Sequence, residues 1–139
     1  MRLGLIFTVI GAALLSACAG SSPQAGSEMA TVTGTVTYLE RRAMPPEAVV
    51  TVRLQDVSRA DAPAILVGEQ RITMAGRQVP IPYEINYDPA SIDPRMTYTV
   101  SARIEIGDRL LMISDTAYRV ITRDAPTRDV EIRVITVAR

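Results

Sequence analysis

The sequence predicts an all-β fold, a compact antiparallel β-sandwich of about eight short strands. Apolar and polar residues alternate with a period of two along most of the chain after residue 30. Turn-forming residues recur at short intervals between the alternating runs, for example at residues 44–46 and 107–108. No segment has a convincing helical period, so we expect one helical turn at most, within residues 88–94.

Four runs carry the clearest alternation. The first, residues 31–39, places Val32, Val36 and Tyr38 on one face and threonines on the other. Strands with one polar face are typical of an antiparallel sheet that is wetted on one side. The other three long runs are residues 48–57, 96–106 and 130–137. Shorter apolar runs complete the set at residues 64–74, 79–87, 110–114 and 117–122.

The run over residues 79–87 is predicted to lie at a sheet edge. Pro80 and Pro82 fall on the same side of this run, and neither has an amide hydrogen to donate to a neighbouring strand. A free edge can accept an additional strand from a partner. The alternative is that the prolines only block unwanted pairing. The candidate partner-binding residues on this edge are Val79, Ile81, Tyr83 and Ile85.

The first 17 residues have the organisation of a secretory signal peptide. Arg2 precedes an uncharged, largely apolar run over residues 3–17. As a helix rising about 1.5 Å per residue, this run would extend roughly 22 Å, which is short of the roughly 30 Å hydrocarbon layer of a membrane. We therefore expect cleavage between Ala17 and Cys18 and no permanent span.

Cys18 is the only cysteine in the chain, and Leu15-Ser16-Ala17-Cys18 resembles the lipobox of bacterial lipoproteins. The resemblance implies a diacylglyceryl group on the Cys18 thiol and usually an acylated amino terminus. Each buried acyl CH₂ contributes about 0.8 kcal/mol, and two or more chains give lasting membrane attachment without a span. Ala19 after the cysteine favours the outer membrane, with the domain facing the periplasm. The alternative is a chance cysteine in an ordinary signal peptide.

These features divide the chain into three parts. Residues 1–17 form the signal peptide, residues 18–30 the lipidated cysteine and a flexible tether, and residues 31–139 the β-sandwich domain. The tether is rich in Gly, Ser and Ala, and coil statistics of about 5–6 Å times the square root of length give it a reach of roughly 20 Å. The domain has no thiol for a disulfide, so an apolar core of Val, Ile, Leu and Met must stabilise it.

Composition excludes several classes of activity. The chain has no histidine, and its 15 basic residues balance its 15 acidic residues. Ser–His and Cys–His nucleophile pairs and histidine metal ligands are therefore excluded. The charge balance gives no attraction toward nucleic acid. We expect no catalytic residues, no cofactor, no metal ion and no nucleic-acid partner.

Two acidic loops are the remaining candidates for chemistry. The first contains Asp56, Ser58, Arg59 and Asp61, and the second contains Asp88 and Asp93. A calcium site needs about six oxygen ligands, and the spacing here matches no EF-hand. The favoured interpretation is that the Asp and Ser side chains bond backbone amides and so fix turns, with Arg59 pairing with a nearby acid. We interpret Asp115 and Thr116, just before Tyr118, as a turn in the same way.

Taken in order, the segments resemble the YbaY-like lipoproteins, which are related to the YscW-type pilotins of secretion systems. Residues 32–72, 76–104 and 110–122 carry the resemblance, with the successive motifs G-x-V-x-Y, V-P-I-P-Y, Y-x-V-S-A-R and D-T-A-Y. The resemblance implies a β-sandwich on a lipid anchor and no known reaction. Pilotin relatives bind a secretin subunit and help it reach the outer membrane. Where those relatives carry a disulfide in the domain, this chain has no cysteine for one.

We therefore expect a non-enzymatic lipoprotein of the bacterial envelope whose β domain binds or supports another envelope component. The first alternative is a pilotin-like chaperone that captures an extended or helical segment of a secretin, in a groove or at the edge formed by residues 79–87. The second alternative is an enzyme that acts on envelope glycan through paired carboxylates of the two acidic loops.

The lipobox interpretation predicts the behaviour of one variant. Cys18→Ser removes the thiol that receives the lipid, so the product should be an uncleaved or soluble precursor. Metabolic labelling with palmitate should then fail for this variant and succeed for the wild-type chain. Efficient palmitate labelling of Cys18→Ser would refute the assignment.

Overall fold

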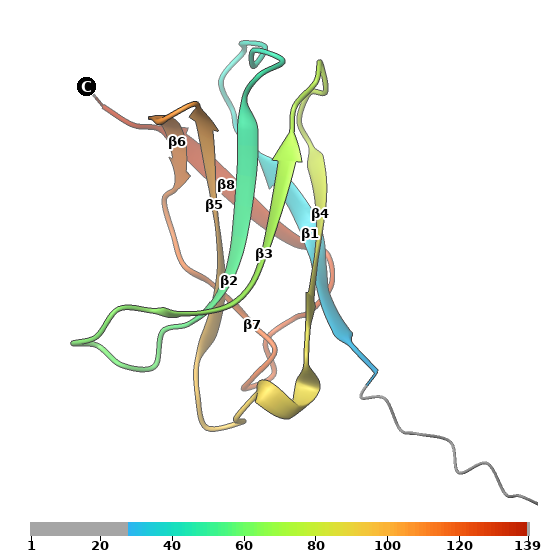
Figure 1. The fold of residues 1–139 in the computed structure, drawn as a ribbon, viewed down its shortest axis with the longest axis vertical. Coiled ribbons are helices and arrows are strands. Elements are labelled where there is room, and N and C mark those ends of the chain that lie inside the picture. Colours follow the sequence, from blue (N-terminus) through green and yellow to red (C-terminus); the bar gives the residue numbers. More distant parts are fainter. Residues whose placement is uncertain (1–27, 139) are drawn as a thin grey trace, which may run out of the picture.

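The computed structural model describes residues 28–138 as an all-β domain (Figure 1). The predicted signal peptide, the predicted Ala17–Cys18 cleavage site and most of the predicted tether lie outside the described residues. Eight strands and one 3₁₀ turn follow one another along the chain. They are β1 (Ala30–Thr37), β2 (Val49–Asp56), β3 (Ile65–Thr73), β4 (Ile81–Tyr87), η1 (Pro89–Ser91), β5 (Tyr98–Ile106), β6 (Arg109–Ser114), β7 (Tyr118–Val120) and β8 (Val130–Thr136).

The strands form one sheet that curls into a nearly closed barrel. Hydrogen-bonded neighbours follow the order β3-β2-β5-β6-β8-β1-β4, and β7 pairs with β5 beside this path. The predicted all-β class and the count of about eight strands are confirmed, and the single helical turn, η1, lies within residues 88–94. The predicted two-sheet sandwich is not confirmed, because β6 pairs with β8 and β8 with β1, which makes the sheet continuous.

One strand pair departs from the predicted antiparallel arrangement. β1 and β8 run parallel, with Gly34 opposite Val130 and Val36 opposite Ile132. All other paired strands are antiparallel. Parallel pairing of the first and last strands is geometrically feasible because six strands separate them in sequence, which is far more chain than a parallel crossover needs.

The interior is filled by the inward-facing residues of alternating strand positions. Aliphatic side chains provide most of it, and tyrosines are its only aromatic residues, which confirms the predicted composition of the core. The largest fully buried side chains are Leu54, Met74, Ile81, Ile85, Ile104, Met112, Ile132, Val32, Val36, Val50, Val52 and Val100. None of the helical structure within residues 28–138 is long and apolar enough to cross a membrane.

Gly34 permits the parallel contact between β1 and β8. A Cβ atom at this position would lie 1.9 Å from the Val130 carbonyl oxygen and 2.8 Å from the Tyr83 hydroxyl. The buried Tyr83 hydroxyl donates a hydrogen bond of 2.9 Å to the same Val130 carbonyl. Tyr83 lies directly opposite Gly34 on β4. One small residue and one hydroxyl therefore connect β4, β1 and β8.

Tyr83→Phe tests the contribution of this connection. The variant removes a buried hydrogen bond, so the free energy of unfolding in urea should fall by about 1–2 kcal/mol. Burial also raises the pKa of Tyr83 above its ordinary value of 10.0. Stability from this group is therefore complete below pH 10 and is lost as pH rises further, because the unfolded chain releases the phenolic proton first.

The matched control is Tyr87→Phe, since the Tyr87 hydroxyl makes no hydrogen bond within residues 28–138. This control should change the free energy of unfolding by less than about 0.5 kcal/mol. Equal effects of the two substitutions would show that the Tyr83–Val130 bond does not connect the strands as described.

Candidate partner-binding site

β4 is an edge strand, as the prolines predicted. It stands at one end of the strand order, and among the described strands β1 is its only ladder partner. The Glu84 amide points away from β1 and donates a hydrogen bond of 2.7 Å to the Gln70 side-chain oxygen on β3. Amide groups alternate in direction along a strand, so position 82 shares this free side. Pro82 therefore removes a donor from the free edge and no bond from the β1 ladder.

The four predicted edge residues take different positions. Ile81, Tyr83 and Ile85 point into the core and are buried, and Val79 precedes the strand and is half-buried. The exposed side chains of β4 are the intervening Pro82, Glu84 and Asn86. A partner at this strand would therefore meet its backbone edge and these polar side chains, not the apolar residues of the predicted set.

The other end of the sheet, β3, faces β4 across a gap that we call the seam. The two strands touch at the middle of the seam, where a Cβ on Gly68 would lie 2.6 Å from the Ile85 side chain and 3.1 Å from the Asn86 carbonyl oxygen. The Gln70–Glu84 hydrogen bond lies beside this contact. No continuous ladder joins the two strands among the described residues. The barrel is therefore closed at the middle of the seam by the packing of Gly68 against Ile85 and by the hydrogen bond of the Gln70 side chain.

Below this contact the start of β3 bends away from β4 (Figure 1). A bulge in the β2–β3 ladder opposite Leu54 and Gln55 inserts Val67 as an extra residue. Beyond the bulge, Ile65 lies opposite Asp56, which in turn lies opposite the buried Tyr98. Because directly opposed residues share a face, Ile65 is on the core-facing side of the sheet. It is nevertheless 56% exposed.

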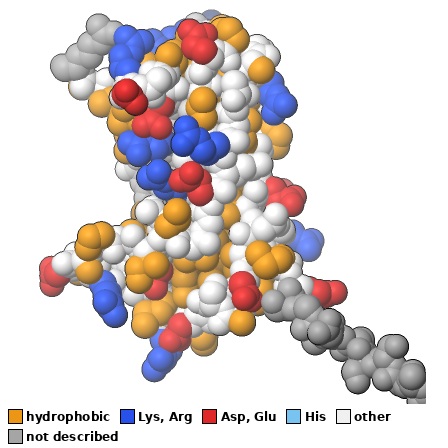
Figure 2. Space-filling model, in the orientation of Figure 1, with side chains coloured by type: hydrophobic (Ala, Val, Ile, Leu, Met, Phe, Trp, Pro, Cys, Tyr) orange, Lys and Arg blue, Asp and Glu red, His pale blue; other side chains and the backbone are white. Residues whose placement is uncertain are grey.

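Two apolar neighbours along the chain are also exposed. Leu66 is 53% exposed and lies opposite Gln55, on the outer face of β3, and Val57, directly after β2, is 37% exposed. We call Val57, Ile65, Leu66 and the half-buried Val67 the seam patch. In Figure 2 hydrophobic side chains gather over the lower half of the viewed face, beside the projecting β2–β3 connection. An uncovered apolar surface next to a strand edge is a candidate site for a protein partner.

A run of apolar residues in the sequence marks the seam patch, although the alternation of apolar and polar residues does not predict it. Residues 64–67 read Ala-Ile-Leu-Val, a run of consecutive apolar residues without alternation. Such a run is ordinarily assigned to a strand buried on both faces. Here the glycine that follows marks a bulge, and the run emerges at an open edge.

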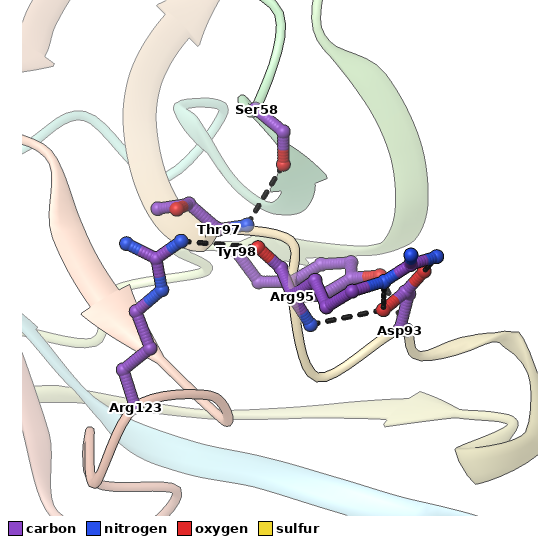
Figure 3. A network of polar contacts seen from close by, with 6 residues as sticks. All are labelled: Ser58, Asp93, Arg95, Thr97, Tyr98 and Arg123. Atoms are coloured by element: carbon purple, nitrogen blue, oxygen red, sulfur yellow. Dashed lines mark hydrogen bonds and ion pairs between the residues drawn. The ribbon is translucent and has the colours of Figure 1, made fainter.

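The acidic loops take part in a network of polar contacts, part of which is drawn in Figure 3. Asp56 accepts hydrogen bonds from the Ser58 amide and hydroxyl, and the Thr97 amide donates to the Ser58 hydroxyl at 2.8 Å. Asp93 accepts from the Arg95 amide at 2.9 Å and from its guanidinium at 2.8 Å. These hydrogen bonds from Arg95 lower the pKa of Asp93 to about 2.

Further polar contacts complete the same network. The Asp93 amide donates to the Tyr98 hydroxyl at 3.0 Å, and Arg123 donates to the Arg95 carbonyl at 3.0 Å. Asp88 accepts from the Ala90 amide and caps η1. The interpretation of Asp56, Asp88 and Asp93 as turn-forming residues is confirmed. Within residues 28–138, no group of three His, Cys, Asp or Glu side chains is placed to hold a metal ion.

Tyr118 follows the third predicted polar turn and has a structural contact. Its hydroxyl accepts a hydrogen bond of 2.9 Å from the Arg133 amide, which joins the start of β7 to β8. Asp115 and Thr116 are exposed in the bend before it.

Comparison with known proteins identifies the family. The family described as Type III secretion system lipoprotein chaperone (YscW) matches residues 27–132. The chain belongs to the YscW family. This confirms the resemblance that the sequence motifs indicated.

Two relatives refine the comparison. The chain is 32% identical over 112 residues to the uncharacterized lipoprotein YbaY of Escherichia coli strain K12, and the match covers 81% of this chain and 59% of YbaY. The chain thus spans less than two thirds of that relative. The fold is similar to an alternative pilotin from the type II secretion system of Vibrio cholerae, with a TM-score of 0.76 and 45% identity over 80% of this chain and 99% of that chain.

The network in Figure 3 predicts how the β2–β3 connection responds to loss of Ser58. Ser58→Ala removes the acceptor of the Thr97 amide, so the connection should open more often. Tryptic cleavage after Arg59 should become several-fold faster. Thr116→Ala, in an exposed bend on the same half of the barrel, should leave the cleavage rate unchanged. Equal cleavage of wild type and Ser58→Ala would contradict the proposed restraint.

Proposed function

We propose that this YscW-family protein is a lipid-anchored envelope protein that acts as a pilotin-like chaperone and captures an apolar segment of a secretin subunit at the seam patch. The observation that carries the proposal is Ile65, which lies on the core-facing side of an edge strand and is 56% exposed. The family description and the 45% identity to a pilotin support the class of partner.

The seam offers two kinds of interaction to a captured segment. The edge of β3 has no ladder partner on the seam side among the described strands, so its backbone can pair with an added strand. The seam patch offers apolar surface beside that edge, and burying one Ile or Leu side chain contributes about 1.5–3 kcal/mol. An extended segment would use both features, whereas a helical segment would use the apolar surface alone.

The position of the seam patch suits a partner near the membrane. β1 starts at the same end of the barrel as the β2–β3 connection (Figure 1), and the first described residue is Glu28. About ten residues separate it from Cys18, so the tether spans at most roughly 35 Å. With Cys18 lipidated, the seam patch would face the periplasmic surface of the outer membrane. A secretin inserts in this membrane.

A second candidate partner is an envelope component other than a secretin. The observation that favours it is the 32% identity to YbaY, a lipoprotein described as uncharacterized. The seam patch would serve that partner by the same interactions. The two candidates differ in whether secretin assembly depends on the protein.

Deletion of the gene tests the proposal when it is combined with matched variants. Deletion should abolish most detergent-resistant secretin multimers in the outer membrane, and the wild-type gene should restore them. Ile65→Asp places a charge in the seam patch and should weaken capture roughly 10- to 100-fold, which corresponds to the loss of about 1.5–3 kcal/mol. Ile135→Asp is the control, because Ile135 is 47% exposed on the outer face of β8, away from the seam.

Two results decide between the candidates. Normal secretin multimers in the deletion strain would remove the chaperone function. If deletion abolishes the multimers and the Ile65→Asp gene restores them fully, the chaperone function stands and the seam patch is excluded as the capture site. Thermal unfolding of both aspartate variants controls for folding, and both should retain the wild-type midpoint because each side chain is already exposed.

A further inference from the structure

A second surface lies at the opposite end of the barrel from the seam patch. Here the β1–β2 connection, the β5–β6 hairpin and the end of β8 enclose a pocket of about 680 Å³. Met44, Ile106, Leu111 and Val137 provide apolar lining. Met44 is buried, and Ile106 and Leu111 are half-buried against the core, so this lining is held in place by packing.

The charged groups of the pocket are two arginines. Arg42 comes from the β1–β2 connection and Arg109 from the start of β6, and no acidic side chain is among the described residues that line the pocket. Glu40 lies 3.6 Å from Arg42 and also accepts a hydrogen bond from the Thr136 hydroxyl, so it partly balances Arg42. Arg109 makes no ion pair within residues 28–138. The pocket therefore combines an apolar surface with the partly balanced charge of Arg42 and the unpaired charge of Arg109 within the described residues.

We propose that this pocket binds an acidic, apolar segment of a partner protein. Guanidinium groups bind carboxylates through paired hydrogen bonds, which a neutral or cationic segment cannot form. The apolar lining would take Leu, Ile or Val side chains beside that carboxylate. The inference does not depend on the secretin proposal, because the pocket shares no residue with the seam patch.

The position and form of the pocket favour a protein segment as the occupant. The lining comes from three segments of the chain that lie together at one end of the barrel (Figure 1). Sites for small molecules usually enclose most of the ligand surface, whereas a groove at an end of a domain suits a side-chain row of a peptide. The chain leaves toward its N-terminus from the other end of the barrel, which turns this pocket away from a membrane anchor (Figure 1).

Binding of designed peptides tests the inference on the full chain in phosphatidylcholine nanodiscs, whose lipids have no net charge. The probe is a labelled 14-residue amphipathic peptide of Leu and Glu, and the comparison peptide carries Lys in place of every Glu. The Glu peptide should bind and shift the NMR signals of Leu111 and Val137. The combined variant Arg42→Glu and Arg109→Glu should bind the Glu peptide at least tenfold more weakly than the wild-type chain. The control variant Arg71→Glu changes a residue on the outer face of β3 and should bind the peptide with wild-type affinity.

Several outcomes would overturn the inference. These are no binding of the Glu peptide, equal binding of the Lys peptide, or unchanged binding by the doubly charge-reversed variant. Shifts confined to Ile65 and Leu66 would assign the peptide to the seam patch instead. Displacement of the peptide by millimolar octanoate, with saturable shifts at Leu111 and Val137, would make the pocket a small-carboxylate site and exclude a protein segment.

Discussion

The rest of the structure depends on the close parallel contact of β1 with β8 at Gly34. The absence of a side chain at Gly34 lets the Val130 carbonyl approach, and the Tyr83 hydroxyl bonds to that carbonyl. Without this contact, β1 and β4 would form a separate ribbon, and the sheet would not curl round. With it, the two end strands, β3 and β4, come face to face.

The seam is the consequence of this closure, because the two end strands meet along only part of their length. Gly68 allows contact with Ile85, and the Gln70 side chain occupies the Glu84 amide, so the middle of the seam is closed. Below it, beyond the bulge at Val67, Ile65 lies on the core-facing side of the sheet and is 56% exposed. A barrel that is almost closed protects its core and still leaves one edge available to a partner.

Local features were predictable from the sequence because local physics determines them. Alternation located the strands, the prolines identified β4 as an edge, and the aspartates at Asp56, Asp88 and Asp93 form the expected turns. The parallel β1–β8 pair was not predictable, because it joins residues about 96 positions apart and depends on a close approach at Gly34. The seam patch was missed because a single inserted residue, Val67, changes which side chains face outward.

The central claim is that a secretin segment occupies the seam patch, and site-specific photocrosslinking in the native envelope tests it most directly. A benzoylphenylalanine in place of Ile65 should give one major adduct that contains the secretin subunit. The same group in place of Ile135, on the outer face of β8, should give none. Secretin adducts of equal yield at both positions, or a position-65 adduct that contains only lipid or another protein, would contradict the account.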